Sequence, residues 1–250
     1  MIKQLMFAPH MRFVACACLT LSILIAPIAS HAALTLNNTR IVFSSDKRNT
    51  SIVIRNPSKN TYAAQSWINT EADDAITIVP FAASPPLFKI KPDSEQLLQI
   101  NALPNTLPQD RESLFFFNLQ EIPQASNEPG NQLNIALRTR IKLFYRPQQL
   151  KGNPAEQLKS LTFSVNENQG ERHLMVNNPT PFYFTFLRLE VSTDERSHKL
   201  SSAQMLAPLS QQTYRLDDIA LNKSSKVRFS VINDFGGYTE PMTLPIQPTR

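Results

Sequence analysis

The feature that most restricts the fold of this chain is a one-by-one alternation of apolar and polar residues, which recurs in short stretches along most of its length. Side chains of a β-strand point alternately to two faces, whereas an amphipathic helix repeats every 3.6 residues. No long segment shows the helical period. Gly is scarce at 5 residues, Pro is abundant at 19, and turn-forming pairs such as Asn-Pro and Pro-Pro separate the alternating stretches. The sequence therefore predicts antiparallel β-sandwiches.

The alternation divides the chain into two groups of expected strands. In the first half we expect strands at Leu34–Phe43, Ser51–Asn56, Ala63–Ile68, Ala75–Val79, Gln96–Ile100, Leu114–Leu119 and Leu133–Tyr145. In the second half we expect them at Leu161–Asn166, His173–Val176, Phe182–Val191, Gln212–Leu216, Lys226–Ile232 and Met242–Ile246. The polar stretch "QQLKGNP", Gln148–Pro154, interrupts the pattern and predicts a linker. We expect one domain over residues 33–149 and a second over residues 150–250, each large enough for its own core.

The first 32 residues have the organisation of a cleaved secretory signal. Lys3 and Arg12 precede an apolar, acid-free run from Phe13 to Ile28, and small residues end at Ala32, where we expect cleavage. A membrane anchor would need about 20 apolar residues, and Pro27 argues against one. The mature chain is therefore expected to be exported, soluble and without stable insertion in a membrane.

Composition excludes several classes of protein. The two cysteines, Cys16 and Cys18, lie within the expected signal, so the mature chain is expected to have no disulfide and to depend on burial for its stability. Removing Lys3 and Arg12 from 25 basic residues leaves 23 against 20 acidic ones, a net charge near +3. That charge is too small to indicate nucleic acid as a partner, and no basic run interleaved with aromatic residues occurs.

Residues that could support catalysis or bind a metal are sparse. Of the mature chain's histidines, neither His173 nor His198 has a Cys, Glu or His partner at metal-ligand spacing. The adjacent pair Asp73-Asp74 would point to opposite faces of a strand, so we expect a solvated turn there. No Gly-rich phosphate loop and no G-x-S-x-G motif occurs. We therefore expect a binding protein rather than an enzyme, with no metal and no cofactor.

Two features remain for binding. The alternation in "QLNIALRTRIKLFYRP", Gln132–Pro147, would make a strand of about 45 Å from Leu133 to Arg146, against about 17–20 Å for an ordinary strand. Arg40 and Lys142 interrupt strands that otherwise look like core. Each either extends to solvent or pairs with an internal acid, or both present an anion site in a cleft.

The stretch "LPQDRESLFFFNLQEIP", Leu107–Pro123, resembles the signature of the periplasmic pilus-assembly chaperones. The positions in register with that signature are Asp110, Glu112, Ser113, Phe116, Asn118, Leu119, Ile122 and Pro123. The stretches "TRIVF", "ASPP", "IKLFYRP", "NNPTPFYFT" and "INDFGG" resemble other parts of the same family. The resemblance extends over nearly the whole mature chain.

This resemblance implies an all-β fold of two immunoglobulin-like sandwiches set at an angle, with a cleft between them. It implies a periplasmic chaperone that binds pilus subunits lacking a strand, supplies one from its own long strand, and delivers the subunits to an outer-membrane usher. A self-capping dimer of the unbound chaperone is also implied. No nucleotide or other cofactor is needed, because the partner supplies folding free energy.

Residue roles follow by position from the same resemblance. The residues implied to fill the groove of the subunit are Leu133, Ile135 and Leu137. Those implied to hold its terminal carboxylate are Arg40 and Lys142. The set implied to join the two domains by salt bridges is Glu112, Arg146 and Asp234. Some relatives close the second domain with a disulfide, which this chain cannot do. The short connection from Pro123 to Leu133 resembles the short-loop branch of the family, that is, the branch with a short loop between the last two strands of domain one.

Two alternatives belong to other classes. A structural pilus subunit or adhesin is also exported and immunoglobulin-like, but should carry a free donor segment at its mature N-terminus and lack its last strand. A secreted glycan-binding or hydrolytic sandwich would need exposed aromatic residues clustered with carboxylates. The sole tryptophan, Trp67, lies in the alternating stretch "AAQSWI" and is expected in the core.

Overall fold

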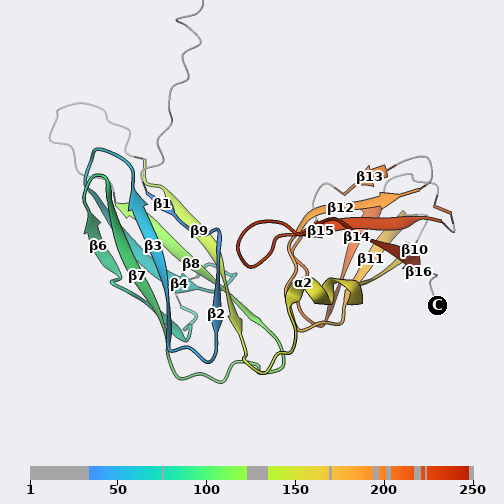
Figure 1. The fold of residues 1–250 in the computed structure, drawn as a ribbon, viewed down its shortest axis with the longest axis horizontal. Coiled ribbons are helices and arrows are strands. Elements are labelled where there is room, and N and C mark those ends of the chain that lie inside the picture. The colour runs from blue at the N-terminus through green and yellow to red at the C-terminus, as the bar shows by residue number, and fades with distance from the viewer. Residues whose placement is uncertain are drawn as a thin grey trace, which may run out of the picture. The chain divides into compact units, whose positions relative to one another are not determined.

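A computed structural model describes residues 34–74, 76–122, 135–168, 171–193, 197–200, 204–216, 221–222 and 224–247. Over these residues almost all of the regular secondary structure is β-strand, gathered in two sandwiches, β1 to β9 in one and β10 to β16 in the other (Figure 1). The prediction of an all-β, two-domain protein is confirmed. Within the same residues no helix combines the length and the hydropathy needed to cross a membrane.

The first domain has nine strands: β1 (Thr35–Leu36), β2 (Arg40–Ser44), β3 (Asn49–Asn56), β4 (Tyr62–Asn69), β5 (Phe81–Ser84), β6 (Leu87–Ile90), β7 (Ser94–Ala102), β8 (Ser113–Ile122) and β9 (Arg138–Arg146). One sheet has the order β1-β3-β7-β5, and the facing sheet has the order β2-β9-β8-β4-β6. All pairs are antiparallel except β2 and β9, which run parallel with Arg40 opposite Lys142. The parallel pair places the first residue of β2 beside the middle of β9.

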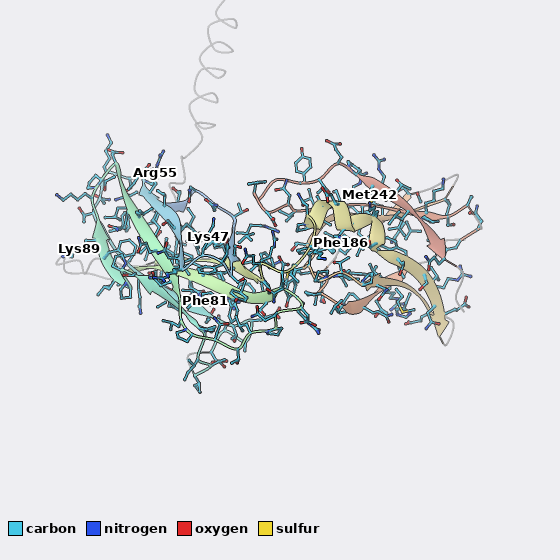
Figure 2. The ribbon with its side chains drawn as sticks, turned by 60° about the horizontal axis from the view of Figure 1, so that its bottom comes forward. Lys47, Arg55, Phe81, Lys89, Phe186 and Met242 are labelled. Atoms are coloured by element: carbon cyan, nitrogen blue, oxygen red, sulfur yellow. The ribbon has the colours of Figure 1, made fainter. Side chains whose placement is uncertain are left out.

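Alternate residues of both sheets fill the core of this domain. Ile54, Leu98, Phe117 and Leu143 are each 0 % exposed. Phe81, labelled in Figure 2, is 4 % exposed, and its ring packs edge to face on that of Phe43 with 5.3 Å between the centroids. Because no disulfide crosses this domain, this close packing of branched and aromatic side chains is its main source of stability.

The second domain begins with a short helix, α2 (Pro154–Gln157), capped by the side chain of Asn153, and a 3-10 turn, η1 (Leu158–Ser160), whose Leu158 is buried in its core. Its strands are β10 (Thr162–Asn168), β11 (Glu171–Asn178), β12 (Phe186–Ser192), β13 (Ser197–Lys199), β14 (Ser210–Leu216), β15 (Lys226–Val231) and β16 (Met242–Gln247). Strand β16 pairs antiparallel with β15 and parallel with β10, so it joins the two layers. Phe163, Phe182, Phe184 and Phe229 lie in the core.

Two expected strands in the first domain differ from the structure. The stretch Leu34–Phe43 is broken, because Asn37 bonds to Val53 through both its backbone N–H and its side chain, and the chain then changes sheet before β2. The strand expected at Ala75–Val79 is wrong for its described residues. There the carboxylate of Asp74 accepts bonds from the backbone N–H groups of the next residues, Ile76 and Thr77, and this local arrangement replaces ladder pairing.

Other differences concern short strands and strand ends. The strand expected from Phe182 begins only at Phe186, because the N–H of Tyr183 is donated to the side chain of Glu112 rather than to a neighbouring strand. The sequence also missed β5, β6 and β13, which have 4, 4 and 3 residues. Such short segments show too few alternations to be recognised.

Candidate functional site

Strand β9 separates apolar from cationic side chains by their parity. Its odd-numbered residues Ile141, Leu143 and Tyr145 are buried in the core. Its even-numbered residues point to the outer face of the sheet, and four of them are cations: Arg138, Arg140, Lys142 and Arg146. Arg40 joins this row from the neighbouring strand, at the level of Lys142.

Arg40 and Lys142, here called the anchor pair, are both partly desolvated. Arg40 is only 8 % exposed, its guanidinium donates to the carbonyl of Ile232 at 3.1 Å, and its Nε has no partner among the described residues. The Nζ of Lys142 donates to the hydroxyl of Thr185 at 3.2 Å. Both contacts reach residues of the second domain, so the pair lies where the two domains meet.

The anchor pair carries positive charge without a close counter-ion. Within the described residues no carboxylate lies at ion-pair distance from either side chain. Burial lowers the pKa of Arg40, although Asp234 and Glu112 oppose this. Burial, and then the charge of Arg40, lowers the pKa of Lys142. Two adjacent, partly buried cations of this kind favour an anion between them.

Glu112, Arg146 and Asp234 form an ionic network that connects the domains. Arg146 donates to Glu112 Oε1 at 2.7 Å and to the two carboxylate oxygens of Asp234 at 2.7 and 2.9 Å. Glu112 Oε2 also accepts from the backbone N–H of Tyr183 at 2.8 Å. Burial raises the pKa of Glu112, and Arg146 partly opposes this. The charge of Arg146 is thus matched by acids, unlike that of the anchor pair.

Arg138 and Arg140 are also matched, by an acid that the sequence did not identify. Arg138 forms a two-bond ion pair with Asp73, and Arg140 Nε lies 3.9 Å from the same carboxylate. Arg138 lies over the ring of Trp67 at 4.9 Å, and Arg140 over Phe116 at 3.9 Å. Asp73 lies in a turn and is exposed, as expected, but its ion pair with Arg138 was not predicted. The expectation of a core tryptophan is wrong, because Trp67 is half-buried on the outer face, beneath an arginine.

The residues before β9 leave apolar side chains in water. Ile135 is 67 % exposed and Leu137 is 46 % exposed, while Leu133 lies outside the described residues. The carbonyl of Leu137 accepts from the N–H of Glu121 at 2.9 Å, which holds this segment beside the end of β8. On its other edge, β9 pairs with β2 only from Lys142 onward. Residues 138–141 therefore have an edge to which no described strand is paired.

A cavity of about 270 Å³ is lined by Arg40 and by other residues of both domains. Phe144 and Arg146 line it from the first domain, and Tyr183 and Phe235 from the second. Phe235 is 94 % exposed, so one wall of the cavity is an aromatic ring open to solvent. The arrangement suits an ionic and apolar contact with another chain. No group of three potential metal-ligating side chains occurs among the residues that the structure describes.

Family models match both domains. The model described as pili and flagellar-assembly chaperone, PapD N-terminal domain, matches residues 33–151. The model described as pili assembly chaperone PapD, C-terminal domain, matches residues 156–243. Together they cover most of the chain.

Individual relatives agree with these models. Chaperone protein PapD of Escherichia coli is 38% identical over 209 residues, which are 82% of this chain and 84% of PapD. Chaperone protein LpfB of Salmonella typhimurium is 34% identical over 235 residues, 93% of this chain and 97% of LpfB. The crystal structure of the YadV chaperone matches with a TM-score of 0.72 at 33% identity, over 85% of this chain and 100% of that chain. The Pseudomonas aeruginosa CupB2 chaperone gives a TM-score of 0.71 at 30% identity, with the same coverage.

Proposed function

Because the chain belongs to the family of pili assembly chaperones, we propose that it binds pilus subunits in the periplasm, completes each with a β-strand of its own, and delivers them to an outer-membrane usher. The family is one of chaperones rather than enzymes. The observation that carries the proposed mechanism is the open edge of β9 directly before the point where β2 begins.

The geometry of that edge favours one kind of incoming strand. A strand that adds to residues 138–141 parallel to β9 lies in line with β2, which starts at Arg40. It must therefore end there, and its terminal carboxylate then meets Arg40 and Lys142. An antiparallel strand would bring an ammonium or a continuing chain to the same two cations, which repulsion or overlap disfavours. The anchor pair thus selects the carboxyl end of a parallel strand.

The exposed side chains before β9 supply the apolar part of the contact. Ile135 and Leu137 are exposed in the free protein, and with Leu133 they share one parity. We propose that these three side chains fill the groove left by the missing strand of a subunit. Without such a partner, an incomplete sandwich leaves unpaired edges and an apolar groove in water, both of which promote aggregation.

The ionic network of Glu112, Arg146 and Asp234 is proposed to hold the two domains in a fixed orientation. It suits this role because Arg146, at the end of β9, bonds to acids in both domains at 2.7 Å. A partly buried network of this kind is better understood as a determinant of geometry than as a source of net stability.

The remaining proposals concern the context of the chaperone. A signal peptide over residues 1–32 would direct export, and the domains would span residues 33–149 and 150–250. The connection from Pro123 to Leu133, which suggests the short-loop branch, lies outside the described residues, as does the signal. A self-capping dimer would cover the exposed Ile135 and Leu137 when no subunit is bound. The rival reading as a structural subunit or adhesin is not favoured, because chaperone family models match both domains.

The proposal is tested by producing the protein in the periplasm with candidate pilus subunits from the same source and measuring soluble one-to-one complexes. Lys142→Ala and Arg40→Ala are each expected to abolish recovery, because the terminal carboxylate loses half of its binding site. Lys89→Ala is the matched control, since Lys89 is an exposed cation on β6 of the same domain and extends outward in Figure 2.

Each outcome bears on a different part of the proposal. If the unaltered protein captures no subunit, the proposed function is wrong. If it captures subunits and both anchor variants do so equally well, the anchor assignment is wrong and the chaperone function stands. Thermal unfolding of the free variants establishes that loss of capture does not arise from loss of fold.

A further inference from the structure

The row of cations on β9 raises a question of register. Adjacent outward-facing positions on a strand are two residues apart, about 6.6 Å. A shift of an added strand by one residue reverses all of its side chains, whereas a shift by two keeps each one on its own face. The alternation of apolar residues therefore discriminates poorly against a two-residue shift. Arg140 and Arg138 lie two and four positions before Lys142, so each could offer a carboxylate an alternative place to end.

Steric hindrance closes only one direction of this shift. An incoming parallel strand cannot move forward along β9 past Lys142, because β2 occupies that edge from Arg40 onward. It can move backward, where residues 138–141 have an open edge, and the cations that it then meets are Arg140 and Arg138. A backward shift of the added strand must therefore be prevented by something other than a clash with the backbone of β2.

Asp73 is placed to do so. It lies in the loop after β4, where its two oxygens accept from Arg138, whose side chain extends over Trp67 on β4, and its carboxylate also approaches Arg140. The same loop holds Arg140 through the carbonyl of Thr70 at 2.6 Å. Asn69 donates to Asp73 at 2.6 Å and fixes the position of the carboxylate. The hydrogen bond from Arg138, followed by that from Asn69, lowers the pKa of Asp73, so it stays ionised at neutral pH.

Aromatic rings draw the two arginines in the same direction. Arg140 lies over Phe116 on β8, and Arg138 lies over Trp67 on β4, one strand further from the open edge. Both guanidinium groups are thus directed towards the middle of the sheet; that of Arg138 is already bound to a carboxylate, and that of Arg140 has the same carboxylate 3.9 Å away. Of the outward cations on β2 and β9, the described contacts leave only the anchor pair without a close acid.

We propose that Asp73 is a positioning residue that sets the register of subunit capture, by occupying Arg138 and Arg140 so that a terminal carboxylate is accepted only at Arg40 and Lys142. The inference rests on the proposed function and adds to it a residue outside the groove-filling and anchor sets. Asp73 acts by excluding a competing register, since it occupies the site that a displaced carboxylate would need.

The test uses Asp73→Asn, which removes the charge and keeps the shape. Asp73 has a φ of 57°, a left-handed conformation that asparagine adopts readily, so the loop is expected to keep its fold. The subunit captured by the unaltered protein serves as the probe. In the unaltered background Lys142→Ala should abolish capture. In the Asp73→Asn background the charges of the two arginines are no longer matched and offer a second anion site. The double variant should therefore recover complex at a level at least about tenfold above whatever Lys142→Ala alone leaves, equivalent to about 1.4 kcal/mol or more.

The matched control is Glu95→Gln, which also removes one acid from a surface ion pair of the same domain, with Arg55 on the other sheet. It raises the net charge equally but lies away from β9, so it should not restore capture to Lys142→Ala. Equal recovery with both neutral variants would assign the effect to overall charge and overturn the proposal. No recovery with Asp73→Asn would overturn it as well.

The register is also read directly. The mature chain is expected to lack cysteine, so Thr139→Cys can be paired with single cysteines placed in turn along the last strand of the subunit. In the otherwise unaltered protein one subunit position should form the disulfide most efficiently. With Asp73→Asn a second position, two residues closer to the carboxyl end, should also react. A single unchanged position would show that Asp73 only stabilises its loop.

Failure of the proposed function gives a different result. If the unaltered protein captures no subunit, or if Lys142→Ala captures normally, the anchor itself is refuted before Asp73 is considered. If the anchor behaves as proposed and Asp73→Asn changes neither the recovery nor the disulfide position, only the inference about Asp73 is wrong.

Discussion

Replacing Ile135 by alanine is expected to weaken capture of a subunit without changing the stability of the free chaperone. Ile135 is 67 % exposed, so its removal leaves no cavity in the free protein. Complete burial of such a side chain contributes about 1.5–3 kcal/mol. Scaled by the fraction that is exposed, burial in the groove of a subunit should contribute about 1–2 kcal/mol. This corresponds to a loss of roughly fivefold to thirtyfold in affinity for Ile135→Ala.

Competition between two chaperones measures this loss. The unaltered and variant proteins, carrying different tags, are mixed in equal amounts with a limiting quantity of subunit released from denaturant. The ratio of the two complexes at equilibrium gives the difference in binding free energy. Ile135→Asp should compete still less well, because a carboxylate cannot be desolvated in an apolar groove.

The matched control is Ile78→Ala. Ile78 is 95 % exposed, so it loses at least as much apolar surface as Ile135, but it lies in the loop after β4 rather than before β9. It should compete equally with the unaltered protein. The reasoning fails if Ile135→Ala competes equally too, or if Ile78→Ala loses as much, since exposed apolar area would then act without regard to its position.

Three further outcomes are expected. Arg146→Ala should lower the free energy of unfolding by about 3 kcal/mol in urea titration, because Glu112 stays buried without its counter-charge, and Glu112→Gln in the same background should restore most of that loss. Burial and the charge of Arg40 lower the pKa of Lys142 in the folded protein. At a pH between this lowered pKa and the ordinary lysine pKa of about 10.4, the unfolded chain binds more protons than the folded one, so the free energy of unfolding rises with pH. Lys142→Met should therefore be more stable than the unaltered protein at pH 7, with an advantage that shrinks towards pH 10; an advantage independent of pH would contradict this. Gly236→Ala should lower the melting temperature, because its φ is 83° and an added Cβ would overlap Thr39 Oγ1, and an unchanged melting temperature would mean that the loop shifts freely.

Parity along single strands was predictable from the sequence. The alternation from Leu133 to Tyr145 predicted which residues of β9 face the core, and Ile141, Leu143 and Tyr145 are buried. It also directed attention to Lys142, a cation in a segment that otherwise looked like core. The overall two-domain β fold followed from the repetition of such stretches, because strand periodicity is a local property.

The partner of Arg138 and Arg140 was not predictable in the same way. Asp73 lies 65 residues before Arg138, in a loop whose path depends on local bonds made by Asp74 to Ile76 and Thr77. The sequence showed two adjacent acids without indicating that one would turn towards β9. Trp67 was assigned to the wrong face for a related reason. Alternation divides the residues of a strand between two faces, but it does not show that the face with Trp67 is the outer one, covered by an arginine from another strand.

The charges on β9 have different surroundings along the strand, and this difference is the physical basis for the carboxylate site proposed at Arg40 and Lys142. Asp73 matches Arg138 and Arg140, and Asp234, with Glu112, matches Arg146. Arg40 and Lys142 remain unmatched at a site where burial already lowers the pKa of each. The free chaperone therefore holds two like charges close together at a cost in stability, and a bound carboxylate relieves that repulsion. A variant that stabilises the free protein by removing one of these charges should lose capture for the same reason, so stability and function are expected to change in opposite directions at Lys142.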